Sequence, residues 1–356
     1  MNYALYAGYH LLFLLSAVCG IYRSRLAVLA FTAGCILLAL LTDGVLPAAD
    51  LNWYRNVFDD LSLDNILLFA IANDFEVLWA VTVVAIKAVL PEGVASVGMA
   101  SLLLLLIPLC WRGVRDRVGV LSLLMIFPGS FLIFMNTMRQ GFSEYLVLAG
   151  LLSASVVLQL LAGAAHRFGY VVALLAQLAR RFPPALLLAP ALVFALLFWR
   201  ILEIVSPEND MHAIYEQLHA NYLSFALKVL LYSLPYIVAQ LARYFERIKA
   251  LDMDPAAAEA WRRASNAFLT IAGLTLVSVL ANARLADRIS FYILPVSLWA
   301  LSCAGISKVS RTLFCIAVFV LGLNSLLLGS HREFFDPSVV VTEQLEHGAA
   351  EGDDGQ

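Results

Sequence analysis

Long apolar runs, each about the length of a bilayer-crossing helix, dominate the chain. A transmembrane helix needs roughly 20 mostly apolar residues. The chain is 62% hydrophobic and only 14% charged, and its mean hydropathy of +0.85 excludes a soluble globular domain. The pattern predicts an all-α polytopic membrane protein with roughly 10–12 transmembrane helices. The clearest runs cover 4–21, 26–41, 98–111, 118–135, 142–162, 185–199, 223–241, 267–282, 291–305 and 313–328.

Basic connectors between these runs predict the topology, because Lys and Arg gather on the cytoplasmic side of membrane proteins. The connectors expected there are 22–25, 112–117, 243–249 and 308–311. Connectors 43–73, 136–140, 206–222, 283–288 and the tail after 330 would then face outward. The first run has no basic residues before it and Arg23 and Arg25 after it, which favours an uncleaved first span with an outer N-terminus.

Two stretches do not fit complete crossings. A full crossing by Glu76–Leu90 would put Arg25 and Arg112 on opposite sides, so residues 61–90 are expected to contain interfacial or re-entrant pieces. Residues 170–181 are short and precede Pro183-Pro184, which breaks helices. Short, broken or re-entrant helices on two separate stretches predict an outward-facing cavity.

The remaining composition sets the domain organisation. Residues 1–335 are expected to form a single transmembrane domain, followed by an acidic, disordered tail over 336–356. The five cysteines have no ligand spacing and are interpreted as packing residues. A net charge of -3 without a clustered basic tract argues against a nucleic-acid partner.

Arg139-Gln140 is the strongest candidate for a functional site, because it places a fixed positive charge where an apolar run begins. Glu144 follows about one helical turn later; it either pairs with Arg139 or orients it toward an anionic ligand. Arginine presents a planar fork of donors that matches phosphate oxygens. A helix-end arginine that snorkels to the interface is the alternative.

Two further outward-facing groups carry acids. Asp50, Tyr54 and Phe58 share one face if their segment is helical, an arrangement suited to a sugar or to an interfacial amphipathic helix. Asp74 and Glu76 stand at the head of an apolar run. Helix capping explains either carboxylate, and a partly desolvated Glu76 would also suit acid or base chemistry.

A fourth group, Arg284, Arg288 and Tyr292, is spaced by four and would line one helical face. It suits a second phosphate clamp or interfacial anchoring. Together with Arg139 these arginines depart from the positive-inside pattern, since they fall in connectors expected to face outward. An anionic ligand handled at the outer face, such as a lipid-linked pyrophosphate, explains the departure.

At these residues the chain resembles the EpsG family of Wzy-type exopolysaccharide and O-antigen polymerases. The family pattern is an Asp with a Tyr four residues on, a Glu and then an Arg-Gln pair opening helices, and a late Arg with Tyr four residues on. Asp50 with Tyr54, Glu76, Arg139-Gln140 and Arg288 with Tyr292 match it in order. The family often has a histidine where this chain has Arg180-Arg181, and His166 lies earlier.

The resemblance implies a metal-independent membrane glycosyltransferase without a cofactor. It would transfer a growing glycan from polyprenyl pyrophosphate to another lipid-linked repeat unit, at the periplasmic or outer face of a bacterial inner membrane. A chain-length regulator and a flippase of the same pathway would be its partners, besides the lipid bilayer. The expected catalytic residues are Glu76, Asp50 and Arg139. The expected substrate-binding residues are Tyr54, Gln140, Arg181, Arg284, Arg288 and Tyr292.

A transporter or flippase for lipid-linked or other anionic substrates is the alternative, because broken helices and intramembrane charges are expected there too. Transport needs access from both faces, whereas the unusual charges gather on one face, which favours the enzyme. A membrane acyltransferase is a weaker candidate, since no His-Asp signature stands out.

Overall fold

The computed structural model describes residues 2–44, 49–66, 68–69, 77–205, 222–248, 253–281 and 283–328, which form helices and no strand. The all-α polytopic membrane fold is thereby confirmed. Its helices are α1 (Asn2–Tyr22), α2 (Ser24–Gly44), α3 (Ala49–Asp60), α5 (Val77–Val89), α6 (Val97–Leu106), η1 (Ile107–Cys110), α7 (Arg112–Arg115), α8 (Val118–Ile126), α9 (Ser130–Asn136), α10 (Met138–Ser153), α11 (Val156–Ala165), α12 (Phe168–Leu178), α13 (Pro184–Val205), α15 (Tyr222–Phe245), α16 (Pro255–Ala281), α17 (Ala283–Ser290), α18 (Ile293–Cys303) and α19 (Lys308–Leu328).

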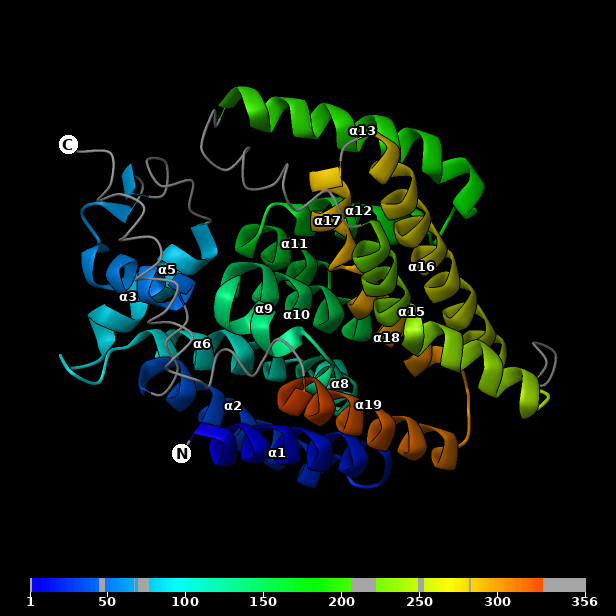
Figure 1. Ribbon diagram of the computed structural model, residues 1–356, viewed down its shortest axis with the longest axis horizontal. Helices are drawn as coiled ribbons and strands as arrows, with labels where there is room; N and C mark the ends of the chain where they lie inside the picture. The colour runs from blue at the N-terminus through cyan, green and yellow to red at the C-terminus, as the bar shows by residue number, and fades with distance from the viewer. Residues whose placement is uncertain are drawn as a thin grey trace, which may run out of the picture.

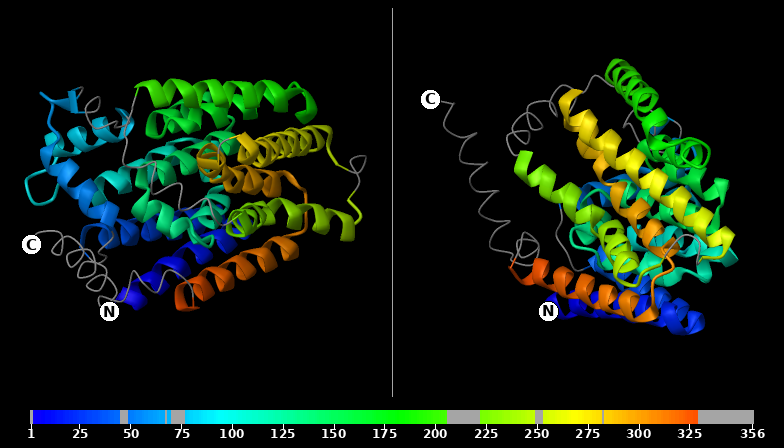
Figure 2. Two further views of the ribbon diagram at one scale, coloured as in Figure 1. Left: turned by 45° about the horizontal axis from the view of Figure 1, so that its top comes forward. Right: turned by 90° about the vertical axis from the view of Figure 1, so that its right-hand side faces the viewer.

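Four helices in the described part are each long and apolar enough to cross a bilayer: residues 4–22 of α1, all of α2, residues 225–245 of α15 and residues 308–325 of α19. Helices α1, α2 and α19 lie side by side along one edge of the bundle, and α13 lies along the opposite edge (Figures 1 and 2). The shorter helices α9 to α12 lie between these edges, so the long helices surround a middle region in which the chain changes direction repeatedly.

The basic connectors meet at one end of the bundle, here called the basic end. Tyr22 hydrogen-bonds through its hydroxyl to Thr312 at 3.1 Å, which joins the first connector to the start of α19. Glu246 accepts a 2.8 Å hydrogen bond from the backbone N–H of Ser307. Helices α3 and α5 lie at the left edge of Figure 1, away from the right-hand ends of α15 and α19. The grouping agrees with the topology expected from the positive charges.

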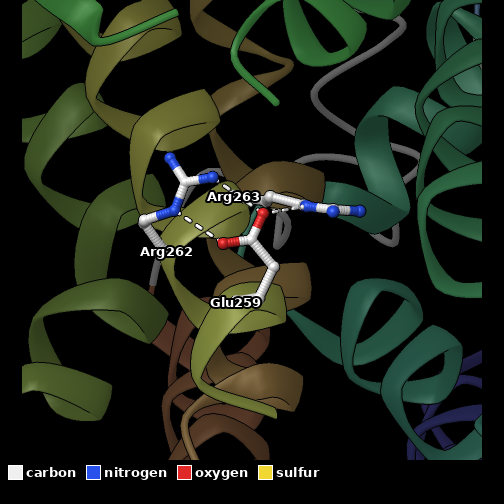
Figure 3. A network of polar contacts seen from close by, with 3 residues as sticks. All are labelled: Glu259, Arg262 and Arg263. Carbon is white, nitrogen blue, oxygen red and sulfur yellow. Dashed lines mark hydrogen bonds and ion pairs between the residues drawn. The ribbon is translucent and has the colours of Figure 1, made fainter. Parts of the chain in front are cut away.

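A network of partly exposed charges lies near the start of α16, at the basic end (Figure 3). Glu259 accepts hydrogen bonds from Arg262 Nε at 2.7 Å and from Arg263 Nε at 2.6 Å. Arg262 and Arg263 lower the pKa of Glu259 to about 2, chiefly through these hydrogen bonds. The carboxylate therefore stays charged at physiological pH and keeps both arginines on one face of the helix.

The run over 118–135 is a broken helix. α8 ends at Ile126, and Gly129 adopts a left-handed conformation, with φ of 85°, immediately before α9. Glycine adopts that conformation without steric cost. Pro128 and Gly129 therefore redirect the chain inside the bundle, and α9 ends in a tight turn at Thr137 from which α10 starts.

The expected single run over 142–162 is wrong, because it contains a helix end. Ala154 closes α10 in the left-handed region with φ of 54°, and the Ser155 hydroxyl caps α11 by accepting a hydrogen bond from the Leu158 N–H. Serine is a preferred N-cap residue. Apolar composition continues across the break, and hydropathy therefore does not reveal it.

α11 and α12 form a hairpin too short to cross the membrane. They have 10 and 11 residues, so each is about 15–17 Å long, about half of the ~30 Å hydrocarbon layer. They pack closely: a Cβ at Gly163 would overlap the Tyr170 ring, and Gln177 donates a 2.6 Å hydrogen bond to Gln159. Its tip is His166. The short piece expected at 170–181 corresponds to the second half of this hairpin.

The far end of the bundle is closed by α3 and α5. With 13 residues, α5 is too short to cross, and its Lys87 returns to the end of α3. The ammonium group donates hydrogen bonds to the carbonyls of Phe58, Asp59 and Leu61 at 2.7, 2.8 and 2.8 Å. The last carbonyls of a helix lack partners within it, so Lys87 stabilises the position of α3.

We expect Lys87→Met to lower the free energy of unfolding by about 1–2 kcal/mol, because the carbonyls at the end of α3 lose a charged donor. The measurement is thermal unfolding in detergent, combined with proteolysis between α3 and α5. Lys308→Met, a matched loss of lysine at the basic end, should leave this cleavage unchanged. Equal cleavage of both variants and wild type would contradict this function of Lys87.

Candidate functional site

Arg139 lies in the first turn of α10, beneath aromatic side chains from α3. Its backbone N–H and its Nε–H each lie 3.4 Å from the Tyr54 hydroxyl oxygen. Its guanidinium carbon is 5.5 Å from the centre of the Trp53 ring, within range for a cation–π interaction. Arg139 is half-buried, so α3 shields the guanidinium without removing it from contact with a ligand.

α17 approaches the same turn of α10 from the other side. Arg288 donates a 3.0 Å hydrogen bond to the side-chain oxygen of Gln140, across 148 residues of sequence. Tyr292 lies in the two-residue break between α17 and α18, and its hydroxyl lies 2.8 Å from the Ser143 Oγ. Gln140, Ser143 and Tyr292 are all buried. These contacts hold α17 against α10. They place Arg139 and Arg288 around the N-terminus of α10.

The hairpin tip contributes a histidine to this group. His166 Nδ1 lies 3.3 Å from the Tyr292 hydroxyl, and the Ser143 hydroxyl donates a 2.8 Å hydrogen bond to the Ala162 carbonyl of α11. The charges of Arg139 and Arg288 both act on His166. Tyr292 therefore bridges α10 and the hairpin tip, and His166 is the group in the described part of the cluster best suited to proton transfer.

Deeper in the bundle the cluster continues as an acid and an ion pair. Glu144 is buried, and its Oε1 has no hydrogen bond within the described residues. Lys228 of α15 lies 2.7 Å from Asp287 of α17, with its ammonium 3.3 Å from the centre of the Phe291 ring. Lys228 also acts electrostatically on Glu144. Glu144 thus belongs with Lys228 at the floor of the cluster, one turn inward from Arg139.

The structure brings together five of the residues predicted from the sequence: Tyr54, Arg139, Gln140, Arg288 and Tyr292. We call these five residues, with Ser143, Glu144 and His166, the polar cluster. Asp50 belongs to α3 and Arg284 to α17, helices that reach the cluster, although the placement of neither side chain is described. Glu76 lies outside the described residues.

Arg181 does not join the polar cluster. Its side chain is exposed in the turn after α12. The charge of Arg263, near the start of α16, acts on the adjacent Arg180, which places this turn toward the basic end. The physical reason is the direction of α12, which leads the chain away from the hairpin tip. The structure therefore does not place Arg181 beside Arg139, where a substrate-binding residue was expected.

His166 was missed as a site residue because the family pattern expects a histidine later in the chain. A usable signal was present: His166 separates two apolar runs that are each too short to cross a membrane. A polar residue between two such runs lies at the tip of a re-entrant hairpin, where irregular backbone lines protein rather than lipid.

These features define a class of protein: an all-α polytopic membrane protein with a polar cluster at the meeting point of broken and short helices. No family model, curated protein or solved structure matches the chain.

Proposed function

We propose that the protein is a polysaccharide polymerase of the inner membrane. It transfers a growing glycan from polyprenyl pyrophosphate to a hydroxyl of another lipid-linked repeat unit, on the periplasmic side. Exopolysaccharide, capsule or O-antigen is the product. The basic end then faces the cytoplasm, and the polar cluster lies toward the periplasmic side.

The observation that carries this proposal is the meeting of Arg139 and Arg288 around Gln140, from helices 148 residues apart in sequence. Two half-buried guanidiniums at a helix N-terminus suit an anion with several oxygens, since arginine binds phosphate oxygens in pairs and the helix dipole adds positive potential. A pyrophosphate leaving group fits this arrangement. Arg284, on the preceding turn of α17 from Arg288, is a further candidate for the same group.

The reaction needs one bond made and one bond broken. The acceptor hydroxyl oxygen attacks the anomeric carbon, and the bond from that carbon to the pyrophosphate oxygen breaks with its electron pair on the leaving group. Arg139 and Arg288 stabilise the charge that develops there. Gln140 positions Arg288 through their hydrogen bond, and Asp50 and Tyr54 hold sugar hydroxyls.

The acceptor hydroxyl must also lose its proton. Glu76 is the acid-base residue that the family resemblance implies, with Asp50 as the second choice. His166 is a third group, and it sits 3.3 Å from Tyr292 inside the cluster. An unchanged distribution of polymer lengths in a Glu76→Gln variant, expressed in a deletion strain, would remove Glu76 as the base.

Liposomes that contain the purified protein test the function itself. Lipid-linked repeat units isolated from a strain lacking the protein are the substrate. We expect a ladder of lengthening polymer on gels, without movement of the units across the bilayer. Translocation without new glycosidic bonds would overturn the proposal and establish a flippase, whose broken helices would look similar.

A further inference from the structure

A cavity with both polar and apolar lining residues lies at the basic end, away from the polar cluster. Its volume is about 270 Å³, and it sits between α1, the start of α8, α18 and α19. Its lining combines charged and apolar groups, among them Ala17, Gly20, Arg117, Ser302, Arg311 and Phe314. None of these residues belongs to the site already described.

Two arginines dominate the electrostatics of this cavity. Arg117 is exposed on the connector before α8, and Arg311 is half-buried in the first turn of α19. The charge of Arg117 acts on Arg311, so the two guanidiniums repel each other. The Nε of Arg311 is buried and finds no hydrogen-bond acceptor among the described residues. Leaving a buried guanidinium N–H without an acceptor is unfavourable, and a bound anion would supply one.

Nearby carboxylates have other partners. Asp116 lines the cavity, but its Oδ2 lies 3.6 Å from Arg112 Nε. Glu246 accepts hydrogen bonds from Ser310 and Ser307, and these bonds lower its pKa. Arg311 acts on Glu246 only through the longer-range charge interaction. Arg117 and Arg311 are the two cationic side chains in the lining, and Arg117 also interacts with Cys303.

The geometry points to a binding site for a phosphate group, held between Arg117 and Arg311 at the basic end. Paired arginines match the oxygens of a phosphate. The apolar wall, which includes Phe314, accommodates the first carbons of an attached chain. Basic pockets between helices on the cytoplasmic side bind the head groups of anionic lipids. A phospholipid and a soluble phosphate compound share the chemistry that the arginines recognise.

Thermal unfolding of the delipidated full-length protein in dodecyl maltoside tests the site. The probes are phosphatidylglycerol, zwitterionic phosphatidylcholine and inorganic phosphate, the last at constant ionic strength. We expect phosphatidylglycerol or inorganic phosphate to raise the midpoint in a saturable way. In Arg311→Gln the apparent dissociation constant should rise about tenfold, the effect of losing one charge-assisted hydrogen bond.

Arg115→Gln is the matched control, because it removes an exposed arginine from the same connector outside the cavity. Arg117→Gln removes the exposed partner and should also weaken binding, so the test remains decisive if Arg311→Gln folds poorly. A response to phosphatidylglycerol alone assigns the site to a lipid head group, and a response to inorganic phosphate assigns it to soluble phosphate. No saturable response, or equal responses of wild type, Arg311→Gln and Arg117→Gln, would overturn the proposal.

Discussion

Arg139→Lys should reduce polymer formation about 100-fold, the loss typical when one preorganised donor to a developing anion is removed. Lysine keeps the positive charge but replaces a planar fork with a single ammonium group. It also loses the Nε–H that lies 3.4 Å from the Tyr54 hydroxyl. The measurement is polymer yield and length distribution from liposomes that contain lipid-linked repeat units.

Arg181→Lys provides the matched control for this experiment. It makes the same chemical change at an exposed arginine in the turn after α12, outside the polar cluster. We expect wild-type polymer from this variant. Normal polymer from Arg139→Lys would show that charge alone is sufficient, and the paired contact with pyrophosphate would be wrong.

His166→Ala should reduce polymer formation by about 100-fold or more, because general acid-base catalysis contributes on the order of 10²–10⁴ to a rate. The histidine is half-buried at the hairpin tip, and its Nδ1 lies 3.3 Å from the buried Tyr292 hydroxyl. Initial rates should be measured from acidic to neutral pH in the same liposomes. The alanine variant should lose both rate and pH dependence.

His166→Asn separates proton transfer from positioning. Its amide can keep a hydrogen bond to Tyr292 but cannot exchange a proton near neutral pH. We expect the asparagine variant to fold as the wild type does and to remain as inactive as the alanine variant. Recovery of activity by asparagine would assign His166 a positioning function only, and Glu76 and Asp50 would then remain the candidates for the base.

Much of the fold could be predicted because helix formation in lipid is a local property. The runs that became α1, α2, α13, α15, α16 and α19 are apolar over enough residues to be recognised one at a time. The breaks were harder to predict. Ala154 and Gly129 interrupt apolar sequence without changing its hydropathy, so the run over 142–162 was assigned to one helix although it contains two.

Part of the candidate site could likewise be predicted from the sequence, and part could not. Arg139 and Arg288 are unusual by themselves, because a charge beside hydrocarbon is costly wherever the chain goes afterwards. Arg181 looked similar in sequence, but the hairpin carries it toward the opposite end. His166 gained its importance only through the Tyr292 contact, which spans 126 residues.

The sequence by itself determined that this protein is an α-helical membrane protein with its basic connectors at one end, because hydropathy and charge act on each segment separately. Only the tertiary structure decided that His166, Tyr292 and Ser143 meet beside Arg139, and that Arg181 does not. Those contacts depend on how broken helices pack against one another. A few backbone angles at Gly129, Ala154 and the turn at 166–167 redirect whole helices, and no local pattern of apolar residues specifies where they arrive.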